Sequence, residues 1–127
     1  MGERNILQIL RDSRYTVILS GSGLMMESGY PLLRDGVESY EIEEKYGYSY
    51  EEMLSSSFYS ARKELFFRFY KEVILKVAEM PPGKGFHMLK KLQDYGLVHS
   101  IITRRIAGLE DRAGCTNVVN LRGTVFE

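Results

Sequence analysis

The chain has 127 residues, which is enough for one domain with a single hydrophobic core. Its 17 basic and 17 acidic residues give zero formal net charge, which argues against nucleic-acid binding by bulk phosphate attraction but leaves room for a local basic patch. From this charge balance we expect no nucleic-acid partner. The apolar runs are too short to span a bilayer and Met1–Asp12 does not resemble a secretory signal peptide, so we also expect no membrane partner and a cytoplasmic location.

The first predicted elements are a helix and a buried strand. Helical periodicity covers Asn5–Arg11. An apolar run rich in β-branched residues follows at Tyr15–Ser20 and ends at Gly21-Ser22-Gly23, which is typical of a parallel strand followed by a tight turn. We interpret Leu24–Ser39 as irregular, because glycines and a proline interrupt it.

The middle of the chain is predicted to be helical. Ser49 is placed to cap a short helix, with a glutamate at the capping-box position. Ser60–Met80 is predicted as a longer helix whose aromatic stripe suits a core better than a cofactor site. Pro81-Pro82-Gly83 ends that helix, and a further helix over Phe86–Tyr95 ends at Gly96.

Two more strands are predicted towards the end of the chain. They are Leu97–Thr103 and Asn117–Leu121, and a short helical turn at Ile106–Arg112 separates them. The only cysteine, Cys115, excludes an internal disulfide and a zinc site of several cysteines, so we expect no zinc within this chain. We interpret Cys115 as a small buried residue, with a reactive thiol as the alternative.

Strands that alternate with helices predict an α/β fold with a parallel sheet, formed by residues 1–127 as one domain. The third strand lies close to the last residue and would leave a bare sheet edge. An autonomous doubly wound domain has more strands than this. We therefore expect a fragment, a truncated reading frame or one half of something larger, with a partner chain able to bind at the open edge.

Three motifs carry a resemblance to a known family. The glycine pair alone is a weak signal, because Met26 stands where the pattern G-x-G-x-x-G needs a third glycine. The wider stretch from Ser20 to Arg34, which contains S-G-S-G-L, E-S-G-Y-P and the arginine, resembles the sirtuin NAD-binding stretch T-G-A-G-I-S, E-S-G-I-P and D-F-R. Residues 102–114 are similar to the sirtuin segment T-Q-N-I-D-G-L-H-x-R-A-G, and residues 117–123 resemble N-V-I-E-L-H-G.

The resemblance implies a partial Rossmann-like, sirtuin-type parallel sheet with a helical insertion at about 40–80. The zinc module and the second half of that fold are absent from this sequence. The implied ligand is NAD or ADP-ribose, with the backbone of the glycine turn facing the phosphates. The implied cofactor-binding residues are Gly21, Ser22, Gly23, Leu24, Glu27, Arg34, Arg104 and Arg105.

The residues that the family uses for catalysis are replaced, so we assign no catalytic residue. Arg122 stands at the position of the histidine that acts as general base, and arginine has no usable acceptor near pH 7. The family's ribose and nicotinamide positions are occupied by Arg104, Arg105 and Ala107. Met25 and Leu32 replace a serine and an aspartate of the family pattern.

Two interpretations of function stay open. The chain is either a divergent domain that binds an adenine dinucleotide with little or no deacylase activity, or part of a working NAD-consuming enzyme, a protein deacylase or NAD glycohydrolase, completed by missing sequence or a partner chain. We expect no acylated protein substrate for the chain as it stands, because the family's acyl-lysine groove lies between two domains.

The arginines suggest a further hypothesis. Arg34, Arg104, Arg105 and Arg122 could line one pocket that favours an anion such as ADP-ribose. The alternative is that they point to solvent or pair with Glu110 and Asp111.

Overall fold

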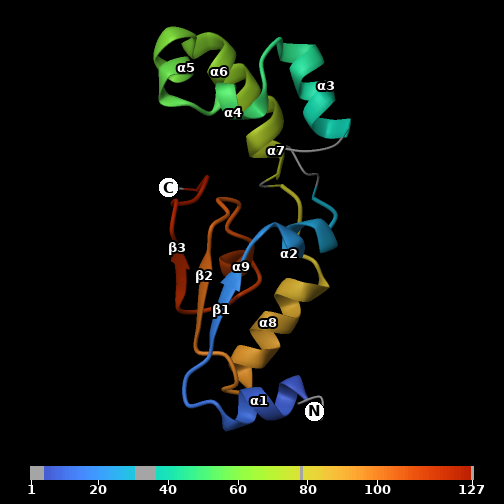
Figure 1. Cartoon of the computed structure of the whole chain (residues 1–127), viewed down its shortest axis with the longest axis vertical. Helices are drawn as coiled ribbons and strands as arrows, with labels where there is room; N and C mark the ends of the chain where they lie inside the picture. The colour runs from blue at the N-terminus through green and yellow to red at the C-terminus, as the bar shows by residue number, and fades with distance from the viewer. Residues whose placement is uncertain (1–4, 31–36, 78, 127) are drawn as a thin grey trace. The chain divides into compact units, whose positions relative to one another are not determined.

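The structure is a computed structural model that describes residues 5–30, 37–77 and 79–126 (Figure 1). Its contacts divide the chain into two compact units. Unit 1 consists of Met1–Ser28 and Pro81–Glu127, and unit 2 consists of Gly29–Met80. The sequence analysis placed a helical insertion at about 40–80, and this range lies inside unit 2.

Unit 1 contains the parallel sheet. Its strands are β1 (Val17–Ser20), β2 (Ser100–Thr103) and β3 (Val118–Asn120), in the order β1-β2-β3, and both pairings are parallel. The predicted parallel sheet is therefore confirmed, although each strand is shorter than expected. Because the strands are parallel and in register, their carboxyl ends meet at one edge of the sheet.

The described residues of unit 1 also form the helices α1 (Ile6–Asp12), α2 (Ser22–Glu27), α8 (Lys84–Asp94) and α9 (Leu109–Arg112). Helix α8 packs against both α2 and α9. The prediction that Leu24–Ser39 is irregular is wrong for Leu24–Glu27, because these residues belong to helix α2. Its six residues include Gly23 and are too few to show an apolar period, so the sequence carried no helical signal there.

The segment before β2 explains why the second strand starts late. The predicted glycine end of α8 is confirmed, because Gly96 has a φ of 72° and Leu97 N–H donates to the Leu92 carbonyl at 2.9 Å. His99 then contacts the start of β1, since its Nδ1 accepts from Thr16 N–H at 2.8 Å and its ring stacks on Tyr15. Leu97 and His99 make these contacts instead of belonging to the strand, although the sequence analysis predicted a strand over Leu97–Thr103.

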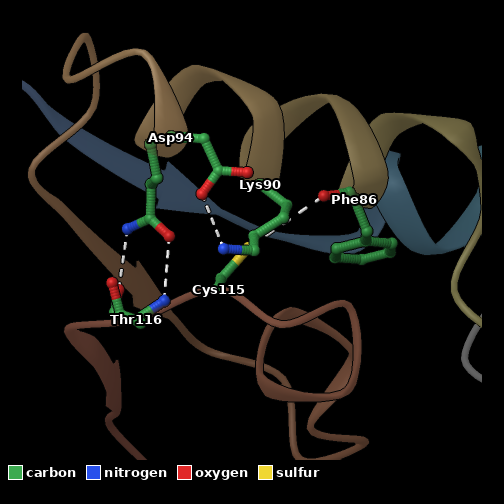
Figure 2. Close-up of polar contacts among 6 residues, drawn as sticks. Phe86, Lys90, Asp94, Cys115 and Thr116 are labelled. Carbon is green, nitrogen blue, oxygen red and sulfur yellow. Dashed lines mark hydrogen bonds and ion pairs between the residues drawn. The ribbon is translucent and has the colours of Figure 1, made fainter.

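The core of unit 1 lies between α8 and the sheet. Phe86 and Ile101 are completely buried, and Leu89 and Leu109 are buried beside them. Cys115 is also buried, with its thiol 4.0 Å from the Phe86 carbonyl (Figure 2). Burial raises the pKa of the Cys115 thiol, and the nearby Glu110 carboxylate adds to this. The interpretation of Cys115 as a small buried residue is therefore confirmed.

Polar contacts join α8 to the segment before β3 (Figure 2). The Gln93 amide forms two hydrogen bonds with the Thr116 backbone, donating to its carbonyl at 2.7 Å and accepting from its N–H at 2.8 Å. Within α8 itself, Lys90 and Asp94 form an ion pair of 2.7 Å. The amide pair fixes the approach of the chain to β3, because both backbone groups of one residue are satisfied by one side chain.

Unit 2 is helical in its described part. It contains α3 (Val37–Tyr46), α4 (Tyr50–Met53), α5 (Ser56–Ala61), α6 (Lys63–Phe69), a π-helical segment η1 (Tyr70–Ile74) and α7 (Leu75–Val77). Met53 and Phe69 are completely buried, so the core interpretation of the aromatic stripe is confirmed for Phe69. The capping box at Ser49 is also confirmed, with Glu52 donating from its N–H and accepting with its carboxylate.

The prediction of one continuous helix over Ser60–Met80 is wrong. The chain leaves the helical conformation at Arg62, where φ is −138° and ψ is 62°, and it widens to a π-helix at η1. Around this break, Tyr59 packs edge to face on Phe66 and Phe67, and the Arg62 guanidinium lies over the Tyr48 ring. Helical period alone does not anticipate a break set by aromatic packing.

A truncation of Phe86 tests the core of unit 1. We expect Phe86→Ala to lower the free energy of unfolding by about 3–5 kcal/mol, because it leaves a cavity where a ring is completely buried. The matched control is Met88→Ala on the same helix, whose side chain is 54% exposed and whose loss should change stability by less than about 0.5 kcal/mol. Urea unfolding followed by circular dichroism measures both, and similar losses in the two variants would contradict this packing.

Candidate functional site

The glycine turn directly follows β1. Gly21 is the N-cap of α2, and Ser22 and Gly23 form the first turn of that helix. A Cβ atom placed at Gly21 or Gly23 would meet no other atom within 4 Å. The space outside both glycines is therefore open, and a ligand could approach the backbone closely there.

The loops after β2 and β3 reach the same edge of the sheet. Arg104 N–H donates to the Ser20 carbonyl at 3.4 Å, and Leu121 N–H donates to the Thr103 carbonyl at 3.1 Å. Arg104 and Arg105 thus follow β2, and Arg122 follows β3, at the edge that carries the glycine turn. The fold places three of the four arginines at this edge of the sheet, while Arg34 and Leu32 lie outside the described residues.

These three arginines have exposed side chains. In the part of the chain that the structure describes, no ion pair links Arg104, Arg105 or Arg122 to an acid. Their expected alternative partners are engaged elsewhere, since Glu110 is buried and the Asp111 carboxylate accepts from the Asn120 amide at 3.1 Å. Three uncompensated positive charges therefore lie at this edge.

A polar row at the ends of the strands was missed by the sequence reasoning. The register pairs Ser20 with Thr103 and Thr103 with Asn120, so one polar residue ends each strand. Ser20 is 3% exposed and its Oγ has no hydrogen-bond partner among the described residues. Asn120 is half-buried, but its Oδ1 atom is buried and also has no partner there. Buried polar atoms are normally paired, so these two are available to water or to a ligand. The signal in the sequence is a polar residue at the end of each of three apolar runs.

The remaining predicted residues serve the fold. Glu27 Oε2 accepts from Gly85 N–H at 3.0 Å, and Ser28 Oγ accepts from Gly83 N–H at 2.9 Å, so both residues hold the start of α8. Leu24 contributes to this junction, because its carbonyl accepts from the Ser28 hydroxyl at 2.9 Å. A role of Glu27 and Leu24 in ligand binding stays a prediction.

The loop between Arg105 and α9 contributes no polar side chain at the family's aspartate position. Ala107 is 3% exposed and ends this loop in the core of unit 1. Gly108 follows with a φ of 63°, and a Cβ there would lie 3.3 Å from the Phe126 ring. Both the conformation and the available space therefore favour glycine at this position.

A separate hollow of about 240 Å³ lies in unit 2. It is lined by Glu38, Glu41, Ile42, Lys45, Tyr46, Glu72 and Val73. None of the predicted site residues lines it. Its central group is Glu72, which accepts from the Tyr46 hydroxyl at 2.5 Å and pairs with Lys45 and Arg68 at 3.3 Å each. The Tyr46 hydrogen bond, together with the two cations, lowers the pKa of Glu72 to about 2.

The Sir2 family model matches residues 21–127, which is most of the chain and includes the glycine turn and all three arginines. The chain belongs to the Sir2 family. It is 38% identical to an NAD-dependent protein deacetylase of Clostridium tetani over 96% of this chain and 49% of that protein. It is 34% identical to an NAD-dependent protein deacetylase of Thermotoga maritima over 100% of this chain and 49% of that protein.

Solved structures of the Sir2 family confirm the partial Rossmann-like fold. One, from work on the structural basis of sirtuin substrate affinity, has a TM-score of 0.82 and 34% identity, over 98% of this chain and 49% of that one. Another, described as Sir2 with a p53 peptide and NAD+, has a TM-score of 0.79 and 33% identity, over 98% of this chain and 47% of that one. The chain thus spans about half the length of the relatives it matches.

The described residues of this Sir2-family chain contain no group of three or more histidine, cysteine, aspartate or glutamate side chains that could hold a metal ion. None of the helices they form is both long and apolar enough to cross a lipid bilayer.

A pair of glycine substitutions tests the junction between α2 and α8. A Cβ at Gly83 would lie 2.6 Å from Ser28 Oγ and 2.8 Å from Ser28 Cα, so we expect Gly83→Ala to lower the free energy of unfolding by about 1–3 kcal/mol. Gly21→Ala should change it by less than about 0.5 kcal/mol, because space is open there and φ is −141°. Thermal and urea unfolding measure both, and a Gly83→Ala variant as stable as the parent would rule out this contact.

The Glu72 network makes a prediction about acid stability. Because the pKa of Glu72 falls from 4.5 to about 2 on folding, its contribution to stability is present above about pH 4.5 and is lost as the pH falls towards 2. We expect Glu72→Gln to destabilise the chain at neutral pH, with the difference from the parent shrinking between these values. Glu44→Gln, at an exposed position, is the control. A difference that stays constant from pH 7 to pH 2, measured by urea unfolding, would show that Glu72 does not titrate in this way.

Proposed function

We propose that this chain is a Sir2-family domain that binds an adenine dinucleotide, NAD or ADP-ribose, at the carboxyl ends of its strands, with little or no deacylase activity in this form. The observation that carries the proposal is the open glycine turn at Gly21–Gly23, beside which Ser20 holds a buried, unpartnered hydroxyl. Ligands of open α/β sheets bind at this end of the strands. The proposal places the chain in the cytoplasm, as the sequence analysis expects.

The binding chemistry follows from charge and backbone access. The turn lets phosphate oxygens approach the N–H groups of Gly21–Gly23 without meeting a side chain. Arg104, Arg105 and Arg122 add positive charge without acidic partners, and guanidinium groups pair well with phosphate oxygens. The same charges disfavour a cationic nicotinamide ring nearby, so we expect tighter binding of ADP-ribose than of NAD.

The residues after β2 and β3 account for the expected lack of turnover. Arg122 stands where the family pattern places a histidine base, and a guanidinium cannot accept a proton near neutral pH. A general base contributes about 100- to 10,000-fold to a rate. Ala107 offers only a buried methyl group where the pattern has an aspartate. Binding can therefore persist while the chemical step is slowed severely.

The second candidate function is an NAD-consuming enzyme, a deacylase or glycohydrolase, completed by further sequence or by a partner chain. It is favoured by the relatives, which are named NAD-dependent protein deacetylases and are about twice as long as the matched region. Structures of relatives are described with acetylated or p53 peptides. An acylated protein substrate therefore belongs to this second candidate.

Calorimetric titration of the purified chain with NAD and with ADP-ribose tests the proposal. We expect saturable binding that is lost in Gly21→Val, since the added side chain fills the space that the phosphates need while the fold has room for it. Arg105→Ala and Arg122→Ala should each weaken ADP-ribose binding by about tenfold or more, because each removes a charge-assisted contact of about 1.5–3 kcal/mol.

The alternative outcomes are distinct. If the folded chain binds neither nucleotide, the proposed function is wrong. If neither Arg105→Ala nor Arg122→Ala changes the affinity for ADP-ribose, the nucleotide binds at the glycine turn without help from an arginine pocket. Release of nicotinamide from NAD by this chain, at a rate that depends on protein concentration, would favour the enzyme over the binding domain.

A further inference from the structure

Three arginines lie in the loops at the carboxyl edge of the sheet, to which the arrows of β1, β2 and β3 point (Figure 1). Arg104 and Arg105 come directly after β2, and Arg122 comes just after β3. Neighbouring strands of a sheet lie about 4.8 Å apart, so β3 ends about 10 Å from β1, which leads into the glycine turn. Positive charge is therefore spread along this edge, from beside the turn to the far strand.

Backbone hydrogen bonds fix the positions from which these arginines extend. After β2, Arg105 N–H donates to the Thr103 hydroxyl at 3.1 Å. After β3, Gly123 N–H donates to the Asn120 carbonyl at 3.1 Å, so that a β-turn carries Arg122. The arginine side chains themselves are exposed. The loops are thus tied to the ends of the strands, while the guanidinium groups are open to a ligand.

The loops contain no acid that could neutralise this charge. Residues 104–109 and 121–126 include the three arginines and no aspartate or glutamate. None of the three guanidinium groups forms an ion pair with a described residue. Because a guanidinium group stays protonated at neutral pH, an anionic ligand gains affinity from each further negative charge that it brings to this edge.

Buried polar atoms without partners extend over the same distance. The Ser20 hydroxyl lies at the end of β1 and Asn120 Oδ1 at the end of β3, and neither atom has a hydrogen-bond partner among the described residues. Buried polar atoms are normally paired. Sugar hydroxyls both donate and accept hydrogen bonds, so they suit a row with an unused hydroxyl at one end and an unused acceptor at the other. A ligand that satisfies both atoms spans all three strands and not the glycine turn alone.

ADP-ribose leaves part of this charge unused. Its negative charge lies in the diphosphate, one charge on each phosphate, and the N–H groups of Gly21–Gly23 already bind these phosphates in the proposed site. Even when the arginines reach back to the diphosphate, three guanidinium groups exceed the charge that it offers. The ribose distal to adenine, which lies on the side of the arginines in the proposed site, is neutral. The surplus positive charge is therefore next to an uncharged part of the ligand.

We propose that the loops of Arg104, Arg105 and Arg122 form a second anion subsite, which binds a phosphate carried on the ribose distal to adenine. The preferred ligand class is an ADP-ribose with a phosphomonoester on that ribose, in place of NAD or unmodified ADP-ribose. A phosphomonoester adds about 1.5–2 negative charges and three acceptor oxygens. Guanidinium groups match such oxygens with paired hydrogen bonds. This subsite extends the proposed nucleotide site at the glycine turn and depends on it.

Calorimetric titration of the full 127-residue chain with two isomeric ligands tests the subsite. ADP-ribose 1″-phosphate carries its extra phosphate on the distal ribose, whereas ADP-ribose 2′-phosphate carries the same group on the adenosine ribose. We expect the 1″-phosphate to bind at least about tenfold more tightly than ADP-ribose, because it adds charge-assisted hydrogen bonds. The 2′-phosphate should gain less than about threefold at about 0.15 M salt, since general charge attraction is screened there.

A pair of arginine variants assigns the gain to the subsite. Arg122→Ala should reduce the gain from the 1″-phosphate to less than about threefold, since it removes a paired contact with that phosphate. Arg14→Ala should leave the gain unchanged. Arg14 is the matched control, because it is exposed and precedes β1, so that the same charge is lost at the amino end of the strands. Circular dichroism checks that both variants are folded.

The outcomes separate this subsite from the nucleotide site on which it depends. If ADP-ribose binds but the 1″-phosphate binds no more tightly, the subsite is wrong and the proposed nucleotide site stands. An equal gain for the two isomers, or a gain that survives Arg122→Ala, would also overturn the subsite. Failure of all three ligands to bind the folded chain would contradict the proposed function, and the subsite with it.

Discussion

The parallel register of three short strands is the constraint on which the rest of unit 1 depends. Backbone hydrogen bonds align Ser20, Thr103 and Asn120 in one row, although these residues are far apart in the sequence. The register alone brings the glycine turn and the loops of the arginines to one edge. A shift by one residue would turn the buried side chains to the other face of the sheet, so the apolar core enforces the alignment. Burial of Ile101 and placement of the candidate site thus depend on the same register.

The glycine turn is tied to the core through α2. Glu27 and Ser28 bind the first backbone N–H groups of α8, which otherwise lack partners inside the helix. The negative charge of Glu27 also suits the amino end of a helix. The same motif that marks the nucleotide stretch in the sequence therefore anchors the helix that fills the core. These two side chains therefore link the helix that begins at the glycine turn to the start of α8.

The sequence anticipated features set by local chemistry and missed those set by distant packing. Glycine and proline punctuation and apolar runs predicted β1, β2, β3, α8 and the capping box at Ser49, and the motifs predicted the family. Helix α2 escaped notice because it is short and contains Gly23, and the break at Arg62 depends on ring packing. The unpartnered Ser20 hydroxyl could not be predicted, because the burial of a side chain depends on the strand register and not on the identity of one residue.

The position of β1 at an edge has a consequence for solubility. The outward backbone groups of Val17 and Leu19 pair with no described residue, and Leu19 is 70% exposed. An apolar edge strand without charge or proline is a template for pairing with a second copy, so self-association of these 127 residues should rise with their concentration.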